Sequence, residues 1–411
     1  MPTYNRPGVF VEEVPSAARP IEGVATSVLG VVGAFKKGDL DGKAHLVTSW
    51  GQFEQDFGGM YKTTEHYQSP HAVFQWFNNG GASLYVARID SGNPATATKV
   101  LNDDAGSPAA SLTINAKNAG AWGNKLSVAV THSNLVDTTL SAATGTSQTI
   151  TVNAIEGVQV GQILKVGTEF HAVASFSPTD KSITLTRAIS SNQAQDLAVA
   201  SQDFNIYVYD DGSLVESWEN MSYGGKTVSG DAATANKSGP TYVGTVITSD
   251  TSKYITVADS NNAVVYSTGN QPYPNVTTAN LSLASGTDGT APSALAAASY
   301  ASTWLPMLDN ADAVTLVIAP DAYVQSGDAV GAATGMITIN NAVNSYCESR
   351  QDCFGILGTF YGQTAAQAVT STSSLNGISY SAVYYPWIKV GEPLSNGTIW
   401  TPPVGAIAGV Y

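Results

Sequence analysis

One stretch of the sequence, Ser69–Asp90, constrains the fold more than any other, because it joins an amphipathic helix directly to a buried strand. Ser69 suits the N-cap of a helix, and Pro70 suits the first helical position, where its missing N–H costs nothing. The nearly continuous apolar run Leu84–Ile89 predicts a central strand that is buried on both faces. The apolar face of the helix comprises Val73, Trp76 and Phe77. The stretch therefore predicts a layered α/β core and acts as scaffold.

The last third of the chain, from residue 291, alternates helical and strand patterns. The expected elements are a helix over 294–308, a strand over 313–319, a helix over 327–350, and strands over 353–358 and 381–390. Strand–helix–strand units of this length form right-handed crossovers, which predicts a mostly parallel sheet. Strands over 27–32 and 84–89 are expected to join this sheet, so that the N-terminal and C-terminal thirds form one α/β core.

Between these thirds the pattern changes to short strands separated by turn residues, which is typical of a β-sandwich or barrel. Within this region, residues 148–189 contain four short strands at regular spacing, which predicts a small β-domain that decorates the surface. The full division predicted is an arm (1–22), the first part of the α/β core (23–92), a β-sandwich (93–132 and 206–290), the inserted β-domain (133–205) and the rest of the α/β core (291–411).

The composition limits the partners of the chain. Charged residues make up only 12% of it, about half the usual share, so uncharged polar residues must supply the surface. Such a surface suits dense packing against other copies, although a weakly charged soluble protein is an equal alternative. The net charge is −14 without a basic cluster, which excludes nucleic acid as a partner. No apolar run approaches about 18 residues, so membrane insertion is not expected.

The sequence offers little for catalysis. All five histidines lie within the first 171 residues. At the carboxyl edge of the C-terminal sheet we expect Asp321 but no histidine of that third of the chain. A Ser-His-acid arrangement therefore requires a distant histidine to fold back onto that edge. Cys347 and Cys353 match no common zinc or redox spacing. We expect no enzyme activity, no cofactor and no metal.

The first 22 residues read as an extended arm. Prolines at four positions prevent a helix, yet Gly8–Val14 is a short, strongly β-prone run. A strand of this kind can complete a sheet in its own subunit or in a neighbour. Composition alone leaves both possibilities open.

A series of short motifs in a fixed order resembles the contractile tail sheath proteins of bacteriophages and related injection devices. In chain order the motifs are Pro7–Pro15, Arg19–Val24, Val47–Trp50, Phe57–Gly59, Phe77–Gly81, Tyr85–Arg88, Trp122–Asn124, Ser285–Gly289, Tyr346–Arg350 and Tyr384–Trp387. The resemblance covers most of the chain outside 133–205.

This resemblance implies a virion structural protein that assembles in the cytoplasm of a host bacterium. It implies hexameric rings of the subunit around an inner tail tube, in contact with baseplate and tail terminator proteins, and contraction that drives the tube through a target envelope. It also implies a subtilisin-like α/β domain without a protease triad. The arm would add a strand to a neighbouring subunit through Gly8, Val9, Phe10, Val11, Glu12, Glu13 and Val14.

Family members continue past the equivalent of Tyr411 into a further domain, so the resemblance also implies that this chain is truncated before it. Two alternatives remain at this point. One is a virion structural protein other than a sheath, and the other is a hydrolase or carbohydrate-binding protein with β-modules on an α/β core. The distribution of the histidines favours the sheath.

Overall fold

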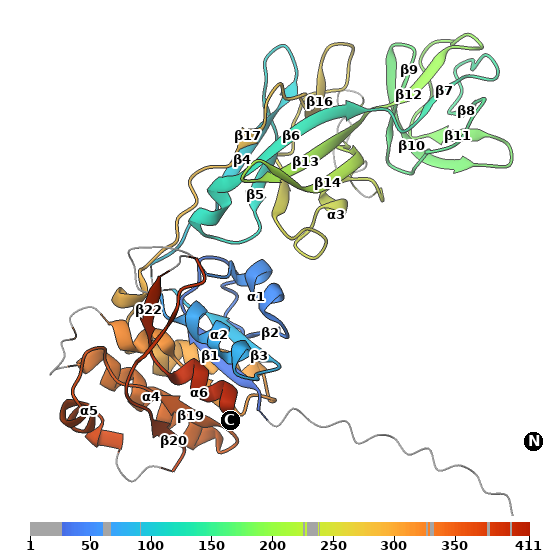
Figure 1. Cartoon of the computed structure of the whole chain (residues 1–411). Helices are drawn as coiled ribbons and strands as arrows, with labels where there is room; N and C mark the ends of the chain where they lie inside the picture. The colour runs from blue at the N-terminus through green and yellow to red at the C-terminus, as the bar shows by residue number, and fades with distance from the viewer. Residues whose placement is uncertain are drawn as a thin grey trace, which may run out of the picture.

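The computed structural model contains three bodies in a row, each with its own hydrophobic core (Figure 1). We call them the α/β body, the middle body and the distal body. The structure describes residues 27–60, 67–90, 92–224, 227, 237, 239–325, 328, 333–375, 379–394 and 397–411. The predicted arm strand Gly8–Val14 lies outside these residues.

The α/β body is built on a six-stranded sheet with the order β2-β3-β1-β18-β19-β20. All neighbours pair in parallel except β2 and β3. Its strands are β1 (Leu29–Gly33), β2 (His45–Val47), β3 (Leu84–Arg88), β18 (Leu316–Ile318), β19 (Phe354–Leu357) and β20 (Ser381–Val383). Because β1 lies between β3 and β18, the two ends of the chain share one sheet, as predicted. β3 lies second from the edge rather than at the centre.

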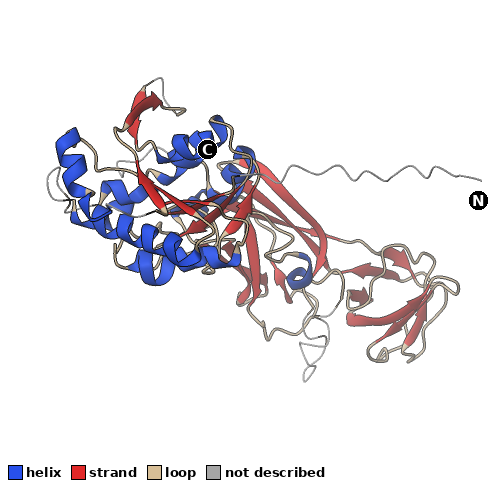
Figure 2. Cartoon of the chain, turned by 90° about the horizontal axis from the view of Figure 1, so that it is seen from below, coloured by secondary structure: helices blue, strands red, loops and turns tan. Residues whose placement is uncertain are grey.

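Helices gather in the α/β body, whereas the other two bodies consist mainly of strands (Figure 2). The helices of the α/β body are α1 (Trp50–Phe57), α2 (Ser69–Asn78), α4 (Thr334–Arg350), α5 (Ala365–Ser371) and α6 (Val404–Val410). Ser49 followed by Gln52 three residues later predicts a helix N-terminus with a capping box, and α1 begins there, with the side chain of Ser49 accepting a hydrogen bond from the backbone N–H of Gln52. α6 packs closely on α2 at Gly405. A Cβ on this residue would lie only 2.3 Å from the carbonyl oxygen of Ala72, so the close approach needs a glycine there.

Two predicted elements were wrong in form, and a proline interrupts the second of them. The expected helix over 294–308 is instead a set of short turns, η3 (Pro292–Ala294), η4 (Tyr300–Trp304) and η5 (Leu305–Asn310), with Pro306 in the last of them. The expected strand over 381–390 divides at Pro386 into β20 and β21 (Ile388–Gly391). β21 forms a separate two-stranded sheet with β22 (Thr398–Thr401).

The middle body contains two four-stranded antiparallel sheets around one core, as expected for a sandwich. The first has the order β14-β13-β6-β17, and the second has the order β15-β5-β4-β16. The strands are β4 (Thr98–Asp104), β5 (Ala110–Ala116), β6 (Leu126–Ser133), β13 (Asp203–Asp210), β14 (Ser213–Ser222), β15 (Ile255–Asp259), β16 (Gln271–Pro274) and β17 (Leu281–Ser282), with the turn α3 (Val243–Val246) and the 3-10 turn η1 (Ala121–Lys125).

The distal body is a six-stranded antiparallel sheet structure with the order β7-β12-β9-β10-β11-β8. Its strands are β7 (Asp137–Thr139), β8 (Thr149–Thr151), β9 (Ile163–Val166), β10 (Glu169–Ser177), β11 (Ser182–Leu185) and β12 (Ala198–Ser201). The four strands predicted over 148–189 are all present. The whole body lies between β6 and β13, which pair with each other in the middle body.

Candidate functional site

The carboxyl edge of the parallel sheet is the first place to look for a site, because ligands of open α/β folds bind there. At this edge β1 ends at Gly33, α2 begins at Ser69, and β18 runs into the 3-10 turn η6 (Pro320–Val324). Asp321, the acid that the sequence placed at this edge, lies in η6 and is completely buried.

Asp321 joins three segments through its carboxylate, and we call this arrangement the Asp321 clasp. Its Oδ1 accepts hydrogen bonds from the backbone N–H groups of Gln68 at 2.9 Å and Ser69 at 3.2 Å. Its Oδ2 accepts hydrogen bonds from Ser69 Oγ at 2.7 Å and from the N–H of Ala34 at 2.8 Å. Burial raises the pKa of Asp321, while these four hydrogen bonds oppose the increase.

The clasp corrects the prediction that Ser69 is the N-cap of α2. The N-cap is Gln68, and Ser69 is the first helical residue, with its hydroxyl committed to Asp321. The close approach depends on Gly33, because a Cβ there would lie 1.9 Å from Ser69 Oγ. Ser69 is 0% exposed, so a substrate cannot reach its hydroxyl. The pair therefore holds the fold together, since a hydroxyl that no substrate can reach cannot act as a nucleophile.

The described histidines form their hydrogen bonds and ion pairs away from the clasp. His45 contacts Asp41, His132 contacts the carbonyl oxygen of Pro274, and His171 lies 3.4 Å from Glu169. His71 lies on α2, where burial lowers its pKa. His66 is outside the described residues. Among the described residues, no group of three or more His, Cys, Asp or Glu side chains could hold a metal ion.

Next to the clasp lies a cavity of about 460 Å³ that we call the aromatic cleft. Its lining residues are Gln68, Tyr323, Val324, Phe360, Tyr361, Trp387, Thr398, Ile399 and Trp400. Gln68 caps α2, and the other lining residues come from the segments after β18, β19 and β20 and from β22. The sequence singled out Trp387 only as part of a motif and gave no sign that these distant aromatic residues meet.

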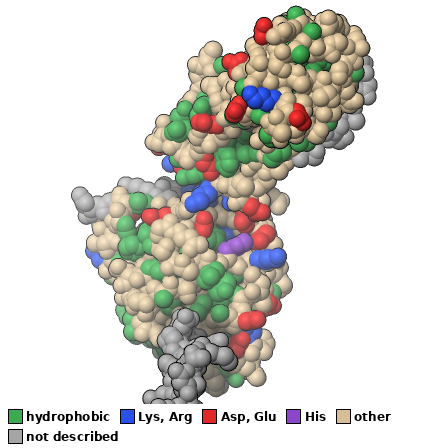
Figure 3. All heavy atoms as spheres, turned by 90° about the vertical axis from the view of Figure 1, so that its right-hand side faces the viewer, with side chains coloured by type: hydrophobic (Ala, Val, Ile, Leu, Met, Phe, Trp, Pro, Cys, Tyr) green, Lys and Arg blue, Asp and Glu red, His purple; other side chains and the backbone are tan. Residues whose placement is uncertain are grey.

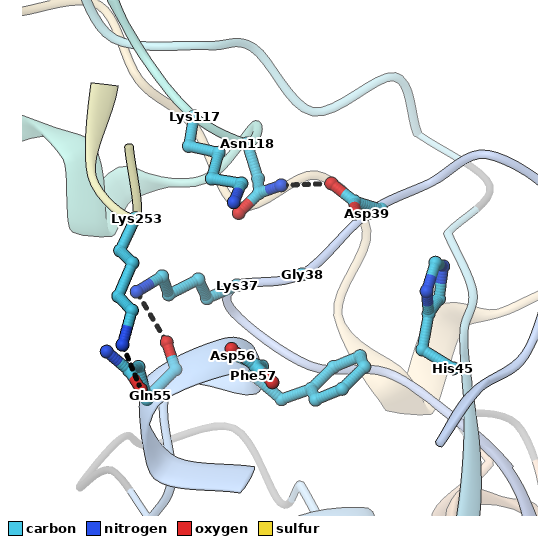
Figure 4. Close-up of a pocket in the computed structure, with 10 residues that line it drawn as sticks. All are labelled: Lys37, Gly38, Asp39, His45, Gln55, Asp56, Phe57, Lys117, Asn118 and Lys253. Atoms are coloured by element: carbon cyan, nitrogen blue, oxygen red, sulfur yellow. Dashed lines mark hydrogen bonds between the residues drawn. The ribbon is translucent and has the colours of Figure 1, made fainter. Parts of the chain in front are cut away.

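A second cavity, of about 220 Å³, lies where the α/β body meets the middle body (Figure 4). Lys37 Nζ donates to the carbonyl oxygen of Gln55 at 2.6 Å and lies 4.6 Å from the ring centre of Trp122. Lys253 Nζ donates to Oε1 of Gln55 at 3.2 Å. Burial lowers the pKa of Lys37. We call this contact region the α/β–middle joint, because these side chains connect the two bodies.

Several motifs that carry the family resemblance converge at the α/β–middle joint. Asn124 and Gly286 exchange two hydrogen bonds, with Asn124 Nδ2 donating at 2.9 Å and the Gly286 N–H donating at 2.8 Å. Asp288 lies 3.1 Å from Lys36 Nζ and accepts a hydrogen bond from the N–H of Ala121. Arg88 NH1 donates to the carbonyl oxygen of Ala119, which joins β3 to the middle body. Residues as far apart in the chain as Lys36 and Asp288 thus meet in one region.

The junction between the middle and distal bodies is centred on Asp203, and we call it the distal joint. Asp203 Oδ2 accepts hydrogen bonds from Gln162 Nε2 at 2.9 Å, from the N–H of Leu135 at 3.2 Å, and from Ser201 Oγ. Burial raises the pKa of Asp203 to about 6, although hydrogen bonds from Ser201 and Gln162 favour the ionised form. No local sequence pattern indicates this role, because the partners lie in three separate segments.

The face of the molecule in Figure 3 carries scattered single charges among uncharged polar side chains. This agrees with the low charged fraction of the sequence. Among the described helices, none is both long and apolar enough to cross a membrane. The only site residues predicted from the sequence, Gly8–Val14, lie outside the described residues, so that site stays a prediction.

Three solved structures of sheath proteins are similar to this chain, each at 12% sequence identity. A sheath tail protein from Desulfitobacterium hafniense aligns with a TM-score of 0.46 over 98% of this chain and 61% of its own. A sheath tail protein from Listeria innocua aligns with a TM-score of 0.48 over 93% of this chain and 55% of its own. The contracted helical sheath of the anti-feeding prophage aligns with a TM-score of 0.32 over 100% of this chain and 52% of its own.

The chain thus spans between 52% and 61% of the length of these three structures. No protein-family model matches the chain, and no curated protein matches it. The similar structures are sheath proteins, as the sequence motifs predicted. TM-scores below 0.5 do not by themselves define a shared fold, so membership of the family is a proposal.

Proposed function

We propose that the chain is a structural subunit of a contractile tail sheath. The observation that carries the proposal is the convergence of the resemblance motifs at the α/β–middle joint. Tyr85–Arg88, Trp122–Asn124 and Ser285–Gly289 are far apart in the sequence, yet all three contribute to this one contact region. Motifs that match only by chance have no reason to meet in space.

The detailed proposal follows the resemblance. Subunits form hexameric rings that stack around an inner tail tube, with baseplate and tail terminator proteins at the two ends, in a virion tail assembled in a bacterial cytoplasm. The α/β body corresponds to the subtilisin-like sheath domain, and the distal body corresponds to a surface decoration. Contraction of the lattice drives the tube through a target envelope.

The mechanism proposed is mechanical. Energy is stored when subunits assemble in an extended lattice, and it is released when they slide into a more tightly packed one, so no nucleotide is needed. The arm residues Gly8–Val14 add a strand to a neighbouring subunit throughout. Main-chain hydrogen bonds between strands tolerate rotation of the attached bodies better than interfaces that depend on matched side chains.

The alternative of a hydrolase gains no support from the carboxyl edge of the sheet. Its serine, Ser69, is buried, and its hydroxyl donates to Asp321 instead of to a base. A virion structural protein with another assembly geometry differs from a sheath only in the lattice that it forms, so assembly is the property to measure.

The test is negative-stain electron microscopy of the full-length gene product mixed with the inner tube protein of the same tail. We expect hollow, cross-striated tubes from the full-length protein with its natural sequence. Val11→Pro should stop assembly while leaving the urea unfolding transition unchanged, because proline removes the N–H that a strand ladder needs. Val11→Thr is the matched control, since it keeps the N–H and a β-branched side chain.

Each outcome separates two parts of the proposal. Absence of tubes from the full-length protein with the tube protein present would contradict the sheath role. Tubes of normal appearance from Val11→Pro would contradict strand addition by the arm and leave the sheath role standing.

A further inference from the structure

The walls of the aromatic cleft are held rigidly by hydrogen bonds. Trp387 Nε1 donates to the carbonyl oxygen of Thr359 at 2.7 Å. The hydroxyl of Tyr323 accepts a hydrogen bond from the N–H of Gly358 at 2.7 Å. Rigid aromatic walls favour binding because little side-chain freedom is lost when a ligand enters. The volume of about 460 Å³ lies within the range of about 300–1,000 Å³ that is typical of ligand pockets.

The mouth of the cleft presents exposed aromatic rings. Tyr361 is 46% exposed and Trp400 is 43% exposed. The Tyr361 ring lies 5.0 Å from that of Trp387 and 6.2 Å from that of Trp400, measured between ring centres. The three rings therefore form one continuous surface that a ligand can cover.

The cleft also contains a polar atom that lacks a partner. Gln68 lines the cleft and is 2% exposed, and its Oε1 is buried without a hydrogen-bond donor among the described residues. A buried acceptor without a donor is unfavourable. Because Oε1 is enclosed, a ligand in the cleft could pair with it only after the Gln68 side chain turns toward the cleft.

These features favour an extended peptide that contains proline. None of the nine lining residues is charged, so the occupant should be uncharged where it enters. Aromatic-lined grooves recognise proline-containing segments, which are already extended and lose little entropy on binding.

We propose that the aromatic cleft receives the segment Val14–Ala18 of a second copy of this chain, with Pro15 packed against the surface that the aromatic rings form. This stretch, Val-Pro-Ser-Ala-Ala, is uncharged and directly follows the arm strand. The inference rests on the proposed function only in that the arm is taken to reach a neighbour. Pro15 then fixes the register of the arm, while the strand supplies main-chain hydrogen bonds.

Chain length allows this docking. Pro15 precedes Ser27, the first described residue, by 12 positions, which span at most about 40 Å when extended. A segment of that length can leave its own α/β body and reach the surface of a neighbour in contact with it.

The test uses a peptide of residues Glu13–Pro20, which contains no aromatic residue, so any change in tryptophan fluorescence reports on the protein. We expect saturable binding to the full chain, at least tenfold weaker with the Pro15→Ala peptide. Trp400→Ala in the protein should weaken binding by a similar factor. Val369→Ala is the matched control, because Val369 is 70% exposed and lies on α5, away from the cleft.

Three results would overturn the inference. The first is an absence of binding at peptide concentrations up to about 1 mM, and the second is equal binding of the two peptides. The third is a difference in fluorescence between the natural chain and full-length Pro15→Ala that does not change on dilution. Contact between two copies is lost on dilution, so such a difference would mean that the segment docks on its own copy. The assembly experiment gives a separate check. Normal tubes from Trp400→Ala would show that assembly does not need the cleft, and they would leave the proposed sheath role standing.

Discussion

The α/β body and the distal joint each bury one carboxylate that is held by N–H and O–H donors rather than by a cation. In the Asp321 clasp both oxygens are satisfied, each by two donors. In the distal joint three donors converge on Oδ2 of Asp203, while Oδ1 is buried without a partner among the described residues.

The difference shows how the same group serves two purposes. Four donors hold the Asp321 carboxylate on both of its oxygens, and each donor would be left unsatisfied without it. Asp203 is satisfied on one oxygen only, and burial raises its pKa to about 6. Burial raises the pKa of both carboxylates, so the difference between the clasp and the distal joint lies in their hydrogen bonds and in whether they connect segments of one body or two bodies.

The largest effect should come from removing the clasp. Asp321→Ala leaves the N–H groups of Ala34, Gln68 and Ser69 and the hydroxyl of Ser69 without an acceptor. We expect the free energy of unfolding of the α/β body to fall by about 3–5 kcal/mol, measured by urea denaturation. The control is Asp312→Ala, which removes an exposed carboxylate. A loss below about 1 kcal/mol would mean that water or rearrangement replaces the clasp.

The next largest effect is the change in stability with pH that Asp203 causes. The pKa of Asp203 is about 6 in the folded chain and about 3.9 when unfolded, so the folded state favours the protonated form. The natural chain should therefore lose stability as pH rises between these values. Relative to Asp203→Asn, we expect a loss of about 2 kcal/mol from pH 4 to pH 7.

This pH dependence is measured as the difference between the two unfolding curves at each pH, so that other titrating groups cancel. A constant offset between natural chain and Asp203→Asn would indicate that Asp203 keeps an ordinary pKa. In that case the missing hydrogen bond to Oδ1 of Asp203 would have no effect on its pKa.

A smaller effect tests the close packing around the clasp. In Gly33→Ala the new Cβ would lie 1.9 Å from Ser69 Oγ and 3.1 Å from Asp321 Oδ2. We expect a loss of about 1–3 kcal/mol in urea unfolding, because the helix must shift away from the strand. Gly51→Ala is the matched control, since nothing lies within 4 Å of its Cβ. Equal stability of the two variants would show that the clasp can move without cost.

The smallest effect concerns the α/β–middle joint. Lys253→Ala removes one exposed hydrogen bond of 3.2 Å to Gln55, and we expect it to change the unfolding free energy by less than about 0.5 kcal/mol. The buried contact of Lys37 with Trp122 would remain. A larger loss would show that the α/β–middle joint depends strongly on this one polar contact.

Local rules predicted elements that depend on neighbours in the sequence. The cap of α1 at Ser49 is one example, because Gln52, its partner, is three residues away. The same rule failed at Ser69, where a partner 252 residues away takes the hydroxyl. The apolar pattern also predicted a helix that runs through Pro306 and a strand that runs through Pro386. Apolar spacing can continue across a proline, whereas regular backbone hydrogen bonding cannot.

The sequence by itself determined which segments are apolar, the mostly parallel pairing of the α/β sheet and the series of short strands in the middle and distal bodies. These follow from periodic burial, which each segment carries in its own residues. Only the tertiary structure decided that Asp321 holds Ser69, that Asp203 holds the distal joint and that distant aromatic residues form one cleft. Such contacts join segments far apart in the chain, and no local pattern specifies which segments will meet.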